Sequence, residues 1–212
     1  MDERDRPEVI RLFPSFVWKA RLGNEDRAAV RAAILEEVSA QRGGAADPEP
    51  GQVWQSRHGL HRVPALEPLV RHLRLGIEQV LAFLHVGSAP FEITGMWVNV
   101  AAPGGAVRMH NHPNNFLSGV YYVQVHEGAD TINFHDPRPQ TAVVRPPVSE
   151  LTAYNTDQVV VRVEEGALLV FPSWLVHSVD PNRSDRMRIS ASFNAMFSSY
   201  AETMGGPLWG ER

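Results

Sequence analysis

The chain has 212 residues, of which 43% are hydrophobic and 21% charged, and its formal net charge is −4. This length suits one domain with a sizeable core, and the absence of a basic block argues against nucleic acid or an anionic membrane as the main partner. The sequence holds no cysteine, which excludes disulfides, thiolate metal ligands and a cysteine nucleophile.

The first 87 residues are predicted to form a segment with two helices that support the rest of a single domain. Their start, MDERDRPEVIRLF, is acidic and polar and lacks the apolar stretch of a secretory signal, so we expect a cytoplasmic protein. Apolar residues recur every four positions over 24–42, which predicts a helix with Asn24 as N-cap and Gly43 after its basic end. A broad apolar stripe predicts a second helix over 64–84, and the intervening Gly- and Pro-rich residues 43–64 are expected to form a loop.

Residues 88–197 are predicted to form the β core that carries the site, and 198–212 a C-terminal tail. Six short runs have the composition of strands: FEITGMWVNV, FLSGVYYVQV, TINF, VVVRV, ALLVFP and RISASFNAMF. Their spacing predicts an antiparallel sandwich or barrel, with the helices packed outside one sheet. The proline-rich residues 136–156 read as a long loop beside which a substrate could enter.

The last predicted strand has one wholly polar face. In RMRISASFNAMF the even positions are polar and the odd positions are apolar, and alternate side chains point to opposite faces of a strand. Two interpretations remain open for the polar face, which could meet solvent or line a polar cavity.

Three histidines are candidate metal ligands. His110 and His112, in RMHNHPNNFLSG, point to the same side if the segment is extended, which suits chelation of one ion. His177 follows an apolar strand in WLVHSV. Polar-loop histidines and a hydrogen-bonded core histidine are the alternatives. Together the three imidazoles could occupy one face of an octahedron and leave the opposite positions open.

Arg188 and Ser190 lie on the polar face of the last strand and are candidate anion ligands. An arginine that faces a barrel interior needs an anion, and its planar guanidinium suits a carboxylate. A dicarboxylate could then bind the metal at one end and Arg188 at the other.

Several collinear stretches resemble the Fe(II)/2-oxoglutarate-dependent oxygenases. The resemblance runs from about residue 96 to 195 through MWVNV, HNHPNNFLSGVYYV, DPR, GALLVFPSWLVHSV and RISASFN. It implies a mainly β fold with flanking helices, built as a double-stranded β-helix, which is a jelly-roll or cupin-like barrel. By position it implies iron ligation by the three histidines, binding of the distal carboxylate of 2-oxoglutarate by Arg188 and Ser190, and further cosubstrate contacts from Asn99 and Tyr122. For these last two, a strand-end amide and a core aromatic are equally good interpretations.

The activity implied by the resemblance is hydroxylation of an unknown small-molecule or peptide substrate by dioxygen, with release of succinate and CO2. The sequence departs from the superfamily at His112, because the usual triad is two histidines and one carboxylate. Asp136 is the nearby carboxylate that could substitute, although a carboxylate before proline is more often a turn residue. The sequence leaves a homodimer open.

Three other functions compete with this one. The first is a cupin-type three-histidine dioxygenase without 2-oxoglutarate, although Phe116 and Leu117 stand where a cupin has glutamate. The second is a three-histidine zinc hydrolase, and the third is a non-enzymatic metal-binding barrel. The remaining histidines are expected to be surface or packing residues: His58, His61, His72, His85 and His126.

Overall fold

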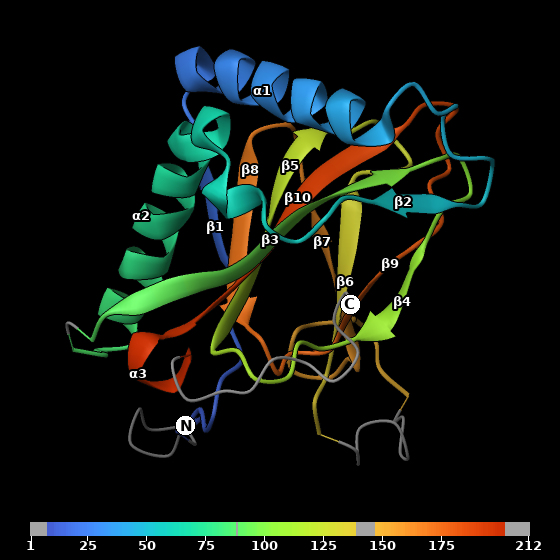
Figure 1. The fold of residues 1–212 in the computed structure, drawn as a ribbon. Coiled ribbons are helices and arrows are strands. Elements are labelled where there is room, and N and C mark those ends of the chain that lie inside the picture. The colour runs from blue at the N-terminus through green and yellow to red at the C-terminus, as the bar shows by residue number, and fades with distance from the viewer. Residues whose placement is uncertain (1–7, 88, 139–146, 202–212) are drawn as a thin grey trace.

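The fold is a sandwich of two antiparallel sheets with helices on the outside of the larger sheet (Figure 1). The computed structural model describes residues 8–87, 89–138 and 147–201. This architecture confirms the predicted class, mainly β with flanking helices. No helix in those ranges combines the length and the apolar character needed to cross a membrane.

The larger sheet has six strands in the order β1-β8-β5-β10-β3-β2, and the smaller has four in the order β4-β9-β6-β7. In chain order, the strands are β1 (Trp18–Arg21), β2 (Val53–Gln55), β3 (Phe91–Ala101), β4 (Val107–His110), β5 (Leu117–Gln124), β6 (Thr131–His135), β7 (Gln158–Arg162), β8 (Ala167–Pro172), β9 (His177–Val179) and β10 (Arg188–Phe197). The helices are α1 (Asn24–Arg42), α2 (Glu67–Phe83) and α3 (Ser198–Ala201), with 3-10 turns η2 (Leu60–Arg62) and η3 (Pro64–Leu66).

Both long helices form where the apolar periodicity predicts them, and one predicted cap is wrong. The N-cap of α1 is Gly23 and the helix begins at Asn24 itself, because the extended backbone ends one residue earlier than expected. The predicted C-terminal glycine is confirmed: Gly43 has φ 58°, and its N–H donates to the Ser39 carbonyl.

The prediction that residues 43–64 form only a loop is wrong. β2 and η2 lie within that range, and Leu60 is completely buried. β2 is only three residues long and pairs with β3, far along the chain, so local composition gives no sign of it. β1 was also not predicted, and it pairs with β8 at the opposite edge of the sheet.

The space between the two sheets is divided into an apolar half and a polar half. Next to β5 and β8, a cluster that includes Val120, Tyr122, Phe134 and Phe171 fills the interior. On the other side, β2, β3 and β10 face β4 and β9 across a cavity of about 320 Å³. The sandwich therefore encloses a site instead of a continuous core.

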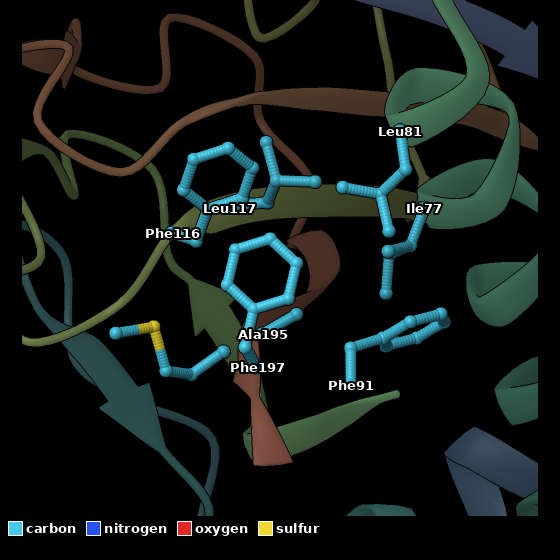
Figure 2. A pocket seen from close by; sticks show the side chains of 8 residues that line it. Ile77, Leu81, Phe91, Phe116, Leu117, Ala195 and Phe197 are labelled. Carbon is cyan, nitrogen blue, oxygen red and sulfur yellow. The ribbon is translucent and has the colours of Figure 1, made fainter. Parts of the chain in front are cut away.

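A far smaller apolar recess lies between α2 and the ends of β3 and β10 (Figure 2). Ile77 and Leu81 of the helix meet Phe91, Phe116 and Phe197 from the sheet side. Its volume of about 10 Å³ is that of an ordinary packing defect, so this recess belongs to the core between helix and sheet.

Candidate metal centre and cavity

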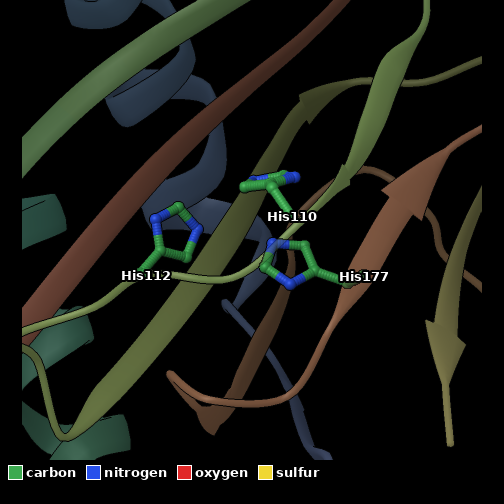
Figure 3. A group of neighbouring side chains, drawn as sticks. All are labelled: His110, His112 and His177. Carbon is green, nitrogen blue, oxygen red and sulfur yellow. The ribbon is translucent and has the colours of Figure 1, made fainter. Parts of the chain in front are cut away.

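The register of the smaller sheet brings two of the candidate ligands together. His110, the last residue of β4, is paired with His177, the first residue of β9. His112 follows in the loop, where its N–H donates to the Ser173 carbonyl over 2.9 Å. The three rings converge (Figure 3), and one ligand nitrogen from each lies within 4.8 Å of the others. The structure thus assembles all three sequence-predicted histidines into one cluster.

Backbone carbonyls fix the tautomers of two of these histidines. Nδ1 of His110 lies 2.8 Å from the Arg108 carbonyl, and Nδ1 of His177 lies 2.9 Å from the Leu175 carbonyl. Because a carbonyl can only accept, each Nδ1 carries the hydrogen and each Nε2 offers a lone pair to a metal. The part of the chain that the structure describes gives the His112 ring no such carbonyl, and Trp97 packs against it with ring centroids 5.9 Å apart.

Burial keeps His112 and His177 neutral. It lowers the pKa of His112 to about 3, with a further contribution from the proximity of His177 and His110. It also lowers the pKa of His177 to about 4, although the hydrogen bond to Leu175 opposes the shift. Near neutral pH these imidazoles are unprotonated, which is the form that binds a metal ion.

The polar face of β10 lines the cavity. Arg188, Ser190, Ser192 and Asn194 all border it, together with Asn99 of β3. Of the two interpretations of this face, the structure supports the cavity and not the solvent. Arg188 and Ser190 are each only 6% exposed.

Arg188 is a buried cation without an anionic partner among the described residues. Among the described residues, no carboxylate forms an ion pair with it, and its Nε has no hydrogen-bond partner. Its guanidinium lies over the Tyr122 ring, 5.5 Å from the centroid. A buried arginine without a carboxylate is costly unless a ligand supplies the charge, so this end of the cavity fits a carboxylate ligand.

Tyr122 stands behind Arg188 and is not among the residues that line the cavity. It is completely buried, and its hydroxyl has no hydrogen-bond partner within the described ranges. Burial raises the pKa of Tyr122 to about 12, against the opposing effect of Arg188, so the phenol stays protonated. The ring therefore supports the guanidinium directly, from outside the cavity lining.

Asn99 lines the cavity but is already engaged by neighbours. Its Cα is opposite that of Ser190 on β10. Its Oδ1 accepts from Gln55 Nε2 over 3.0 Å, and its Nδ2 donates to Ser192 Oγ over 3.1 Å. One amide hydrogen remains for a ligand.

Asp136, the alternative carboxylate ligand, does not join the histidines. Its carboxylate forms a two-pronged ion pair with Arg138, with distances of 2.6 and 2.9 Å, and this pair lowers its pKa. Residues 136–138 and 147–156 contribute nothing to the cavity lining, and residues 139–146 of the same predicted loop lie outside the described residues.

Sequence reasoning missed two residues at the rim of the cavity. His58, expected to be a surface or packing residue, lines the cavity and stacks on Trp97 with centroids 4.5 Å apart and planes 12° apart. Gln55 lies beside it, with Oε1 3.3 Å from His58 Nε2. Both residues belong to the stretch that was predicted to be loop, where nothing in the local composition indicates a site.

A jelly-roll sandwich with three clustered histidines and a buried arginine in one cavity suits a mononuclear metal centre with an anionic ligand beside it. The comparison with protein families agrees: residues 95–194 match the family described as "Putative 2OG-Fe(II) oxygenase". The part of the chain that carries the three histidines and Arg188 is thus similar to this family. None of the curated proteins matches the sequence.

Solved structures share the fold at low sequence identity. The non-heme alpha ketoglutarate dependent carbocyclase SnoK from nogalamycin biosynthesis is 19% identical, with a TM-score of 0.63 over 93% of this chain and 90% of that one. A Pseudomonas putida prolyl-4-hydroxylase is 16% identical, with a TM-score of 0.55 over 86% and 93%. HygX from Streptomyces hygroscopicus, solved with nickel, 2-oxoglutarate and hygromycin B, is 12% identical, with a TM-score of 0.59 over 87% and 84%. These likenesses confirm the predicted double-stranded β-helix.

Proposed function

We propose that this protein uses Fe(II) and 2-oxoglutarate to hydroxylate an organic substrate with dioxygen, releasing succinate and CO2. One observation carries the proposal: a cluster of three histidines and a buried arginine without a carboxylate partner among the described residues border the same cavity. The binding of nickel and 2-oxoglutarate by HygX, which shares the fold, supports the same pairing of ligands here.

His110, His112 and His177 would hold the metal through one nitrogen each. Bound Fe(II) supplies the activation of dioxygen and the oxidative decarboxylation of the keto acid. Three histidine ligands leave the remaining positions open for small ligands. The carbonyls of Arg108 and Leu175 keep two of the three rings in the correct tautomer and orientation.

Arg188 would bind the distal carboxylate of 2-oxoglutarate, and Ser190 would add a hydrogen bond. The guanidinium is rigidly placed, because β10 lies between β3 and β5 and the Tyr122 ring lies under it. Little side-chain entropy is therefore lost on binding, and a planar fork matches a carboxylate well. Asn99 and Tyr122 remain proposed as secondary contacts to the cosubstrate.

The apolar half of the sandwich shields this chemistry from water. Phe171 packs against His177 with centroids 4.8 Å apart, and Phe134 lies 6.2 Å from the same ring. Val120 and Ile132 also line the cavity. Exclusion of water strengthens the interactions of Arg188 and protects reactive species from side reactions.

The function is tested by following 2-oxoglutarate and succinate with iron-loaded protein in air. We expect slow conversion to succinate even without the prime substrate, at a rate that falls when the iron is removed and recovers when it is restored. His85→Ala, at a position outside the cavity, is the matched control for His177→Ala. If iron-loaded protein leaves 2-oxoglutarate unchanged, the proposed oxygenase activity is wrong.

A further inference from the structure

Beyond Arg188 and Ser190, the cavity wall along β10 is built from two neutral side chains, Ser192 and Asn194, whose oxygens each already accept a hydrogen bond. Ser118 donates its hydroxyl hydrogen to Asn194 Oδ1 over 2.7 Å, which leaves Asn194 Nδ2 as the group available to a ligand. Gln55 donates to Asn99, and Asn99 donates to Ser192 Oγ. Both Ser192 and Asn194 border the cavity.

The hydrogen bonds that reach Ser192 all run in one direction, from the rim to the interior. Because Gln55 Nε2 is a donor to Asn99, Gln55 Oε1 must be the acceptor for His58 Nε2, and that nitrogen carries the hydrogen. At the inner end, the Ser192 oxygen accepts from Asn99 and keeps its own hydrogen for donation. Nowhere in the described chain does an acceptor take that hydrogen, so Ser192 offers a donor to the cavity.

The cavity also has an excess of positive charge when a metal ion and 2-oxoglutarate are bound. Its described lining contains Arg188 but no aspartate, glutamate or lysine. A divalent metal ion on three neutral histidines, together with Arg188 and a dianionic cosubstrate, leaves one positive charge uncompensated. A carboxylate at the position of His112 would remove that charge, as in the usual two-histidine site. A partly buried excess charge is unfavourable. The cavity that holds the metal ion and 2-oxoglutarate should therefore bind one more anion.

We propose that Ser192 and Asn194 form a substrate subsite for an anionic group of the carboxylate type. The proposal rests on the proposed function, because the excess charge arises once the metal and 2-oxoglutarate are bound. Ser192 and Asn194 are two residues apart on β10 and therefore point to the same face, where both can donate to one carboxylate.

On this proposal, the substrate enters between the edges of the two sheets. β2 is the edge strand of the larger sheet and β4 is the edge strand of the smaller one, and both contribute residues to the cavity. The exposed Gln55 and His58 lie at this opening. A cationic group on the substrate would leave the free donors of Ser192 and Asn194 unsatisfied.

Three fluorinated probes of similar size test the subsite: fluoroacetate, 2-fluoroethanol and the 2-fluoroethylammonium ion. Full-length zinc-loaded protein saturated with 2-oxoglutarate is titrated with each probe while the fluorine NMR line width is followed. We expect fluoroacetate to bind most tightly and the ammonium probe not to bind. The double variant Ser192→Ala/Asn194→Ala should weaken fluoroacetate binding by about tenfold or more, because it loses two hydrogen bonds to a charged group.

Two further variants keep the test independent of the stability of the double variant. Ser149→Ala, at an exposed position, should leave fluoroacetate binding unchanged. Gln55→Ala, at the exposed rim, removes the donor that orients Asn99 and should weaken binding by about threefold. The proposal is overturned if fluoroacetate binds no better than the ammonium probe, or if binding is unchanged in both Gln55→Ala and the double variant.

The affinity for 2-oxoglutarate, measured by calorimetry on the same samples, separates this proposal from the function on which it rests. Normal 2-oxoglutarate binding with loss of fluoroacetate binding in the double variant supports the subsite. If zinc-loaded protein does not bind 2-oxoglutarate, the proposed function fails. The probes are then titrated against zinc-loaded protein alone, and an unchanged fluoroacetate affinity in the double variant overturns the subsite as well.

Discussion

His110 and His177 face each other across β4 and β9, with ring centroids 4.3 Å apart. The same kind of hydrogen bond to a backbone carbonyl holds each ring. In both, Nδ1–H donates to the carbonyl of the residue two positions earlier, Arg108 or Leu175. Both Nε2 lone pairs are therefore oriented before a metal arrives. His112 joins from the loop and is oriented by packing, so the cluster has two preorganised ligands and one that is less constrained.

The difference between the two kinds of ligand predicts unequal effects of substitution. His110→Ala and His177→Ala should each lower zinc affinity more than His112→Ala, by about tenfold, because an oriented ligand loses less entropy when the metal binds. Competition against a chromophoric chelator measures the three affinities. Equal losses in all three variants would show that the carbonyl contacts of Arg108 and Leu175 do not govern affinity.

The lowered pKa values of His112 and His177 predict that the metal-free protein loses stability in acid. Their values of about 3 and 4 in the folded protein lie below the ordinary value of 6.5, so the unfolded chain binds more protons between these limits. The free energy of unfolding should fall as pH drops from 6.5 toward 4, by up to about 1.4 kcal/mol per pH unit for each histidine. Urea unfolding at several pH values measures the slope.

The matched control for this pH dependence is His177→Gln, which removes one of the two titrating groups. The slope between pH 6.5 and 4 should decrease in the variant. Zinc should leave it at least as steep in the wild type, because bound metal keeps protons off the folded protein. An identical slope in wild type and variant would contradict a neutral, buried His177.

Two substitutions of Arg188 should distinguish the effect of its charge on 2-oxoglutarate affinity from the effect of its planar shape. Arg188→Ala should weaken 2-oxoglutarate binding by about a hundredfold, the loss expected for two charge-assisted hydrogen bonds. Arg188→Lys keeps the charge without the planar guanidinium, so its affinity for 2-oxoglutarate should lie between those of Arg188→Ala and the wild type. Arg186→Ala, at an exposed position two residues earlier, is the control. Calorimetry on zinc-loaded protein gives the affinities, and an unchanged value for Arg188→Ala would exclude this arginine as the anchor.

The sequence predicted those helices and strands whose residue pattern depends on the element itself and not on distant partners. Two helices follow from apolar periodicity, and six strands follow from the composition of short runs. His110, His112 and His177 follow from two short motifs, and the sheet register brings the three side chains together. β1 and β2 were missed because strands of four and three residues depend on partners far along the chain. The sequence does not show whether the polar face of β10 meets solvent or a cavity, because both surroundings favour the same polar residues. Only the facing sheet distinguishes the two.

Gly119 of β5 lies where the packing around the larger sheet has no space for a side chain. A Cβ there would come within 2.3 Å of the Phe193 ring and 2.5 Å of the Leu169 carbonyl. Since the carbonyl belongs to a paired strand and cannot move easily, Gly119→Ala should destabilise the protein by about 1–3 kcal/mol. Gly59→Ala, with no atom within 4 Å of its added Cβ, should be nearly neutral. Thermal unfolding compares the two, and equal melting temperatures would contradict the tight packing at Gly119.

The central claim is that the three histidines and Arg188 hold a metal ion and 2-oxoglutarate at two ends of one cavity. Calorimetric titration of 2-oxoglutarate into Fe(II)-loaded and metal-free protein, under anaerobic conditions, tests this claim most directly. We predict one binding site per chain in the iron-loaded protein, with affinity at least about tenfold lower after the metal is removed, because one end of the ligand then loses its partner. Equal binding with and without metal, or no binding to the iron-loaded protein, would contradict the claim.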